Sequence, residues 1–165
     1  MTLSGAELAR IRQHVAAVFP HEACGLILAR ADARRFLEAR NVQDLVRAFN
    51  PEEEPPATEA YTVDPTTLLE AGALGLRGWR VAAIYHSHTN GRLELSERDR
   101  AAALRDGAPL YPGTIYLVAA LGAALSGDKL RIAAWVWQAG AFRPEPLTVT
   151  DGAENVDTAE GGALA

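Results

Sequence analysis

Two histidines and a nearby aspartate are the side chains of this sequence best suited to hold a metal ion. The run Trp79–Tyr85 is mostly apolar and β-prone, which predicts a buried strand. His86 and His88 follow at its end, and residues at i and i+2 of a strand project from the same face. Ser96 then begins a predicted helix whose first turn carries Asp99. Two neutral imidazoles and one carboxylate are three protein ligands for a zinc ion that keeps a position open for water.

Each half of this pattern also has an interpretation without a metal. Pairs of histidines two residues apart occur in proteins that bind no ion. Ser96-Glu97-Arg98-Asp99 also fits a capping box, with Ser96 as the N-cap and Asp99 at N3. The two interpretations are compatible, because Ser96 can cap the helix and still face the site. The combination of a strand end, a short glycine-containing loop and a helix start favours the metal site.

These residues resemble the motif of the JAMM (MPN-plus) metalloprotease family. The family motif is a distant Glu, then His-Ser/Thr-His, seven residues, Ser, two residues and Asp. Here seven residues, Thr89 to Leu95, separate His88 from Ser96, and the aspartate follows at the family's spacing. Glu22, just after a proline and before an apolar run, matches the distant acid.

The resemblance covers roughly Leu8 to Val149 and implies a fold. That fold is α/β (α+β), a curved mixed β-sheet flanked by helices, JAMM/MPN-like (cytidine-deaminase-like). Two positions depart from the family, whose members often carry proline after the second histidine and before the serine. This chain has Thr89 and Leu95 there. Those positions shape the loop and do not touch the metal, so the departure concerns the geometry of the substrate loop.

The resemblance also implies a zinc metallopeptidase with one Zn2+ per chain, held by His86, His88 and Asp99. Zinc brings the pKa of a bound water from ~15.7 towards ~7. Glu22 is then expected to take the proton as a general base and to pass it to the leaving amine. Ser96 is expected to donate to the tetrahedral oxyanion.

The expected substrate also comes from the resemblance. The family in general hydrolyses amide or isopeptide bonds after the C-terminal glycine of ubiquitin or ubiquitin-like proteins. Small single-domain bacterial members look like processors of ubiquitin-like sulfur-carrier proteins with a diglycine tail. Two alternatives stay open: a catalytically inactive MPN-type scaffold that binds partners, and a zinc hydrolase acting on a small non-protein amide. A deaminase is disfavoured because the sequence has no Pro-Cys-x-x-Cys pair.

Four other side chains that could do chemistry are predicted to be structural. His14 lies within a predicted helix and is interpreted as a surface or packing histidine. His21 points away from the site if Glu22 lies on an extended segment. Cys24 is embedded in an apolar run with no nearby cation, where a thiol is inert. Ser87 lies on the strand face opposite the two histidines.

Composition and charge are those of an ordinary globular protein. The 165 residues are 48% hydrophobic and 22% charged, enough for one domain with a core. No apolar run approaches the ~20 residues of a membrane span, and no signal peptide is visible. One cysteine fits a reducing cytoplasm, and a net charge of −5 argues against a nucleic-acid partner. Arginine replaces lysine almost throughout, which suggests a bacterial source; the oligomeric state stays open.

The chain is expected to form one domain over 1–149 and a flexible acidic tail over 150–165, which holds four acids and no base. The proline-rich stretch Asn50–Pro56 is predicted to be an irregular surface loop, either a substrate flap or a plain solvated loop. The predicted helices begin at a Ser4–Glu7 capping box, at Asp64 before Pro65, and at Ser96, the last running to Arg105. The predicted strands are Ala23–Ala29, Arg34–Val42, Thr114–Leu121, Lys129–Gln138 and Ala141–Val149, besides the one before His86.

Overall fold

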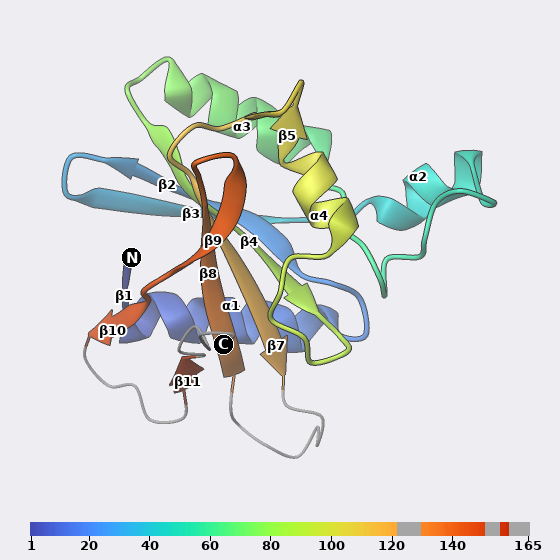
Figure 1. The fold of residues 1–165 in the computed structure, drawn as a ribbon, viewed down its shortest axis with the longest axis horizontal. Helices are drawn as coiled ribbons and strands as arrows, with labels where there is room; N and C mark the ends of the chain where they lie inside the picture. Colours follow the sequence, from blue (N-terminus) through green and yellow to red (C-terminus); the bar gives the residue numbers. More distant parts are fainter. Residues whose placement is uncertain (122–129, 151–155, 159–165) are drawn as a thin grey trace.

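A seven-stranded, mostly antiparallel sheet runs through the molecule, with helices on both of its faces (Figure 1). The structure, a computed structural model, describes residues 1–121, 130–150 and 156–158. The strand order is β11-β8-β7-β4-β2-β3, and β9 also pairs with β8. Among the described strands of this sheet, only β4 with β7 and β11 with β8 pair in parallel. This mixed α/β sheet flanked by helices confirms the predicted fold class.

The strands of the main sheet have the following bounds: β2 Cys24–Arg30, β3 Ala33–Ala39, β4 Arg80–His88, β7 Ile115–Leu121, β8 Leu130–Gln138, β9 Ala141–Glu145 and β11 Val156–Thr158. Two small sheets lie outside it. β1 (Thr2–Ser4) pairs in parallel with β10 (Thr148–Thr150), and β5 (Leu104–Arg105) pairs with β6 (Ala108–Pro109).

Helix α1 (Gly5–Val18) covers one face of the sheet. Ser4 and Glu7 form the predicted capping box, in which each side chain accepts from the other residue's backbone N–H. The apolar stripe that follows is buried at Leu8, Ile11 and Val15 and packs against the strand face that carries Tyr85. The local sequence pattern therefore accounts for both the start and the buried side of this helix.

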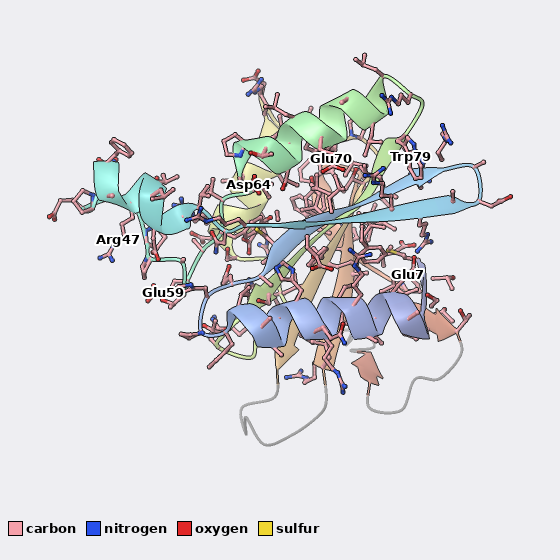
Figure 2. The ribbon with its side chains drawn as sticks, turned by 180° about the vertical axis from the view of Figure 1, so that it is seen from behind. Glu7, Arg47, Glu59, Asp64, Glu70 and Trp79 are labelled. Atoms are coloured by element: carbon pink, nitrogen blue, oxygen red, sulfur yellow. The ribbon has the colours of Figure 1, made fainter. Side chains whose placement is uncertain are left out.

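Helices α3 (Pro65–Gly75) and α4 (Glu97–Ala102) lie on the other face, so that α1 and α3 enclose the sheet (Figure 2). Asp64 caps α3 with Pro65 at its first position, as predicted. Leu74 of α3 is buried in a cluster with Ile84 of β4 and Leu95. Because side chains alternate along a strand, Ile84, His86 and His88 share the face covered by α3 and α4.

The segment after Ser96 corrects one prediction. The helix expected to run to Arg105 ends at Ala102, and Leu104–Arg105 instead forms β5 of a small hairpin. Asp106 and Gly107 close that hairpin with φ of 51° and 75°, which a right-handed helix does not permit. The turn chemistry of the Asp-Gly pair therefore overrides the alanine-rich helical pattern.

Other element boundaries also differ from the prediction. The single strand expected over Ala141–Val149 is two strands, β9 and β10, and Pro146, which lacks the N–H that a continuous ladder needs, lies between them. The strand expected over Arg34–Val42 ends at Ala39.

A short helix, α2 (Gln43–Phe49), was not predicted and projects from the side of the molecule (Figures 1 and 2). The acidic proline-rich stretch after it has no regular element, as predicted. Most of the predicted tail over 150–165 lies outside the described residues. Within the tail, Val156–Thr158 is described and forms β11. No helix in the described ranges is long and apolar enough to cross a membrane.

Candidate metal centre

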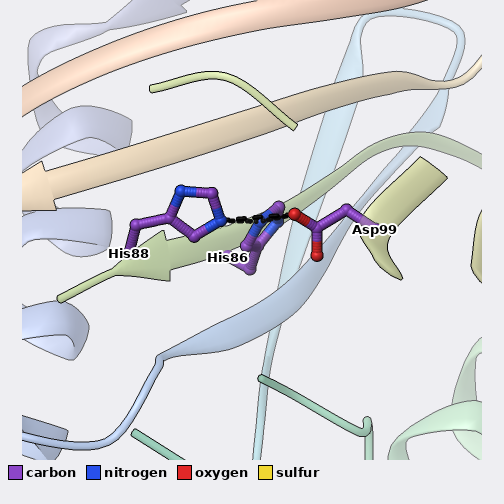
Figure 3. Close-up of side chains that lie close together, drawn as sticks. All are labelled: His86, His88 and Asp99. Atoms are coloured by element: carbon purple, nitrogen blue, oxygen red, sulfur yellow. Dashed lines mark hydrogen bonds and ion pairs between the residues drawn. The ribbon is translucent and has the colours of Figure 1, made fainter. Parts of the chain in front are cut away.

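His86, His88 and Asp99 converge at the carboxyl end of the central strand β4 (Figure 3). The Nε2 atoms of the two histidines lie 3.1 Å apart. The Oδ2 atom of Asp99 lies 3.4 Å from His86 Nε2 and 3.3 Å from His88 Nε2. All three side chains are buried. The predicted ligands thus form one tight triangle of donor atoms.

The size of this triangle fits a zinc ion. Tetrahedral zinc binds nitrogen and oxygen at about 2.0–2.2 Å, which places neighbouring ligand atoms about 3.3–3.5 Å apart. The two distances to Asp99 Oδ2, 3.3 and 3.4 Å, agree with that spacing, and the 3.1 Å between the two Nε2 atoms is slightly shorter. The outer ring nitrogen of His88, Nδ1, lies 3.1 Å from the Arg92 carbonyl oxygen. When Nδ1 carries the proton and donates it to this carbonyl, the lone pair of Nε2 is free to bind a metal. Metal-binding imidazoles are usually held in this way.

The N-terminus of α4 holds Asp99 in place. The Ser96 hydroxyl and its backbone N–H both donate to Asp99 Oδ2, at 2.6 and 2.7 Å. The Asp99 N–H donates back to Ser96 Oγ at 3.1 Å. The capping box and the candidate metal ligand therefore use the same carboxylate, and the two interpretations of the sequence hold together. Ser96 remains exposed at the mouth of the site.

The charges of the three side chains depend on one another. Burial alone would raise the pKa of Asp99, but hydrogen bonds from His86 and His88 outweigh it and hold that pKa far below its usual range. Burial likewise works against the charged form of His88, yet Asp99 and Glu22 raise its pKa. For His86 burial dominates and lowers the pKa. The centre thus combines a firmly ionised carboxylate with one imidazole kept neutral, a donor set suited to a divalent cation.

Glu22 lies on the wall of the same cavity. Its backbone N–H donates to the Ala57 carbonyl at 2.8 Å, and its own carbonyl accepts from the Asn41 amide at 3.0 Å. The residue is only 4% exposed, and this burial raises the pKa of its carboxyl from 4.5 to about 8. The charge of His88 opposes that rise and the charge of Asp99 adds to it.

The cavity in front of the centre has a volume of about 880 Å³. One wall comes from Thr58 and Glu59, and the other from the loop between β4 and α4, including Thr89. The Thr89 hydroxyl donates to the Thr58 carbonyl at 2.9 Å and joins the two walls. Leu95, the second position that departs from the family motif, is buried in the core.

The four side chains predicted to be structural lie outside the triangle. His14 Nδ1 pairs with the Tyr85 hydroxyl at 2.9 Å, and His21 is exposed near Asp44. Cys24 is fully buried, and this burial raises the pKa of its thiol to about 12. The Ser87 hydroxyl accepts from the Ala23 N–H at 2.8 Å.

Two residues near the site were missed in the sequence. The ring of Tyr61 stacks on His86, and the Asn41 side chain connects the Glu22 backbone to the segment that carries Tyr61. No local pattern marks either residue, because both contacts join parts of the chain that are distant in sequence. The isolated bridge between Asn41 and Val63 is the pairing that brings these parts together.

Comparisons with known proteins agree with this fold. Residues 6–137 match the family described as prokaryotic homologs of the JAB domain. The solution structure of a protein from Desulfitobacterium hafniense is similar, with a TM-score of 0.64 and 21% identity over 92% of this chain and 93% of that one. A solution structure from Salinibacter ruber has a TM-score of 0.52 and 22% identity, over 92% of both chains. No curated protein matches the sequence.

Proposed function

Because this chain belongs to the family of prokaryotic homologs of the JAB domain, we propose that it is a zinc-dependent metallopeptidase. The proposed substrate is a ubiquitin-like sulfur-carrier protein, cleaved at the amide or isopeptide bond after its C-terminal diglycine. The observation that carries the proposal is the triangle of His86, His88 and Asp99, with donor atoms 3.1–3.4 Å apart. His88 of this triangle lines the cavity that Glu22 and Ser96 also line.

Zinc bound in the triangle would supply a Lewis acid that activates water near neutral pH. Glu22 is the proposed general base. Its carboxyl is buried and has a raised pKa of about 8, so it can both accept and release a proton near neutral pH. A cation in the centre favours the ionised carboxylate and lowers that pKa again. Glu22 would therefore accept the proton of the attacking water and then deliver it to the leaving amine.

Ser96 is the proposed donor to the oxyanion. Its side chain is exposed at the cavity mouth, but its hydroxyl donates to Asp99 Oδ2 in this structure. Donation to a substrate carbonyl would replace that hydrogen bond, while the Ser96 backbone N–H keeps its own bond to Asp99 Oδ2. One such donor contributes about 100-fold or more in rate.

The shape of the cavity supports a thin, extended substrate. Its two walls, at Thr58–Glu59 and Thr89–Ser96, approach each other where Thr89 contacts Thr58. A diglycine has no side chains, so its backbone can approach the metal centre between such walls. An extended tail could also add as a strand beside a sheet edge near the centre.

The test combines metal analysis with a cleavage assay. Purified protein is expected to bind one zinc per chain and to shorten a sulfur-carrier protein that bears a C-terminal extension, as measured by mass spectrometry. Glu22→Gln is expected to retain zinc and lose cleavage. Failure to bind zinc at saturation would contradict the whole proposal. Zinc binding without cleavage of this substrate would leave the metal centre but refute the substrate, and would favour the scaffold or the small-amide hydrolase.

A further inference from the structure

The aromatic ring of Tyr61 lies flat against the imidazole of His86. The ring centroids are 4.6 Å apart and the planes differ by 22°, which is a stacked arrangement. Tyr61 belongs to the segment between α2 and α3, whereas His86 is near the end of β4. The contact therefore joins two parts of the chain at a candidate metal ligand.

His86 needs such a contact more than His88 does. The outer nitrogen of His88 pairs with the Arg92 carbonyl, a hydrogen bond that fixes the orientation of its ring. The corresponding atom of His86, Nδ1, is fully buried and has no hydrogen-bond partner among the described residues. Imidazoles that bind metals almost always have that second hydrogen bond. For His86, the stacked ring is the contact that can take its place.

Asn41 and Val42 hold the backbone on both sides of Tyr61. The Asn41 amide donates to the Ala60 carbonyl at 3.0 Å, and its Oδ1 accepts from the Thr62 N–H at 3.1 Å. The Val42 N–H also donates to the Thr62 carbonyl at 2.9 Å. Tyr61 is thus positioned independently of the metal, which allows it to hold His86 before an ion binds.

We propose that Tyr61 is a positioning residue of the metal centre, whose ring orients His86 so that Nε2 faces His88 and Asp99. The inference rests on the metal centre of the proposed function, but not on its substrate. Preorganised ligands bind an ion more tightly because less side-chain freedom is lost on binding. The effect of Tyr61 should therefore be visible in zinc affinity itself.

The experiment measures zinc dissociation constants by competition with a chromogenic chelator. Tyr61→Phe keeps the ring and is expected to bind zinc within about twofold of the unmodified protein. Tyr61→Ala removes the ring and is expected to weaken binding by about 10–100-fold, the usual effect of losing a contact that orients a ligand. Tyr111→Ala is the matched control: Tyr111 is an exposed tyrosine in a turn outside the cavity lining, and its loss should leave affinity unchanged.

Circular dichroism of the metal-free variants checks that each is folded. If Tyr61→Ala unfolds, Tyr61→Leu preserves apolar volume without a flat ring and is expected to weaken zinc binding in the same way. Wild-type affinity in a folded Ala or Leu variant would overturn the inference, and equal losses in the Phe and Ala variants would show that the hydroxyl acts instead. An unmodified protein that binds no zinc would refute the proposed function itself.

Discussion

The Nε2 atoms of His86 and His88 face each other at 3.1 Å, and both face the same oxygen of Asp99. Two imidazole nitrogens at that distance need a proton or a cation between them, because their lone pairs otherwise repel. A proton shared between the two nitrogens satisfies neither of the two contacts to Asp99 Oδ2. A divalent cation can bind all three donor atoms at once, so the triangle is well suited to hold an ion.

We expect the triangle to be essential for metal binding. Replacing His86 with Ala should lower zinc affinity by more than about 100-fold, because it removes a metal ligand itself and not a residue that only orients one. Metal content after dialysis, measured by mass spectrometry, tests this. His21→Ala is the control, because His21 is exposed and lies outside the triangle. Stoichiometric zinc in the His86→Ala variant would place the metal elsewhere.

The two roles assigned to Ser96 can be separated. Ser96→Ala removes a helix cap and is expected to cost about 1 kcal/mol of stability. Loss of the oxyanion donor should in addition lower kcat by about 100-fold, with a smaller change in KM. Ser4→Ala removes the equivalent cap from α1, distant from the site, and is expected to reproduce the loss of stability alone. Urea unfolding and steady-state kinetics measure both quantities, and an unchanged kcat in Ser96→Ala would remove Ser96 from the mechanism.

The stability of the metal-free protein should depend on pH through Glu22. Its carboxyl has a pKa of about 8 in the folded protein and 4.5 ordinarily, so the folded state holds a proton that the unfolded state releases. Its contribution is therefore complete below about pH 4.5 and is lost as the pH rises towards 8.

Glu22→Gln, which cannot ionise, should gain stability relative to the unmodified protein by a few kcal/mol between those pH values. Urea unfolding of the metal-free proteins at several pH values tests this difference. Glu94→Gln, which removes an exposed carboxylate from the lining of the same cavity, should follow the unmodified protein. A constant difference between Glu22→Gln and the unmodified protein across the range would show that Glu22 is not desolvated in solution.

Gly25 of β2 lies opposite Tyr85 of β4, where there is no room for a side chain. A Cβ at this position would lie 2.5 Å from both the Leu37 carbonyl oxygen and the Tyr85 ring. Gly25→Ala should therefore destabilise the protein by about 1–3 kcal/mol through overpacking. Gly72→Ala in α3, where nothing lies within 4 Å of the added Cβ, should instead stabilise it by about 0.5–1 kcal/mol. Thermal unfolding of both variants tests the contrast; equal effects would mean that β2 shifts to accept the methyl group.

The features that were predictable are those decided by neighbouring residues. The Ser4–Glu7 and Ser96–Asp99 capping boxes form through hydrogen bonds within one helical turn. The common face of His86 and His88 follows from the alternation of a strand. Such local rules needed no knowledge of the rest of the chain, and they identified all three members of the donor triangle.

The features that were not predictable depend on pairings between distant segments. The antiparallel pairing of β2 with β4 sets Cys24 opposite His86 and so brings Glu22 to the cavity wall, a place that the family resemblance predicted but no local pattern did. The bridge between Asn41 and Val63 brings the ring of Tyr61 against the ring of His86. Sequence spacing specified which side chains could bind a metal, because backbone geometry repeats over a few residues. Only the tertiary structure decided what surrounds them. Contacts between distant segments depend on how the strands pair, and that pairing is set by which face of the whole sheet becomes buried.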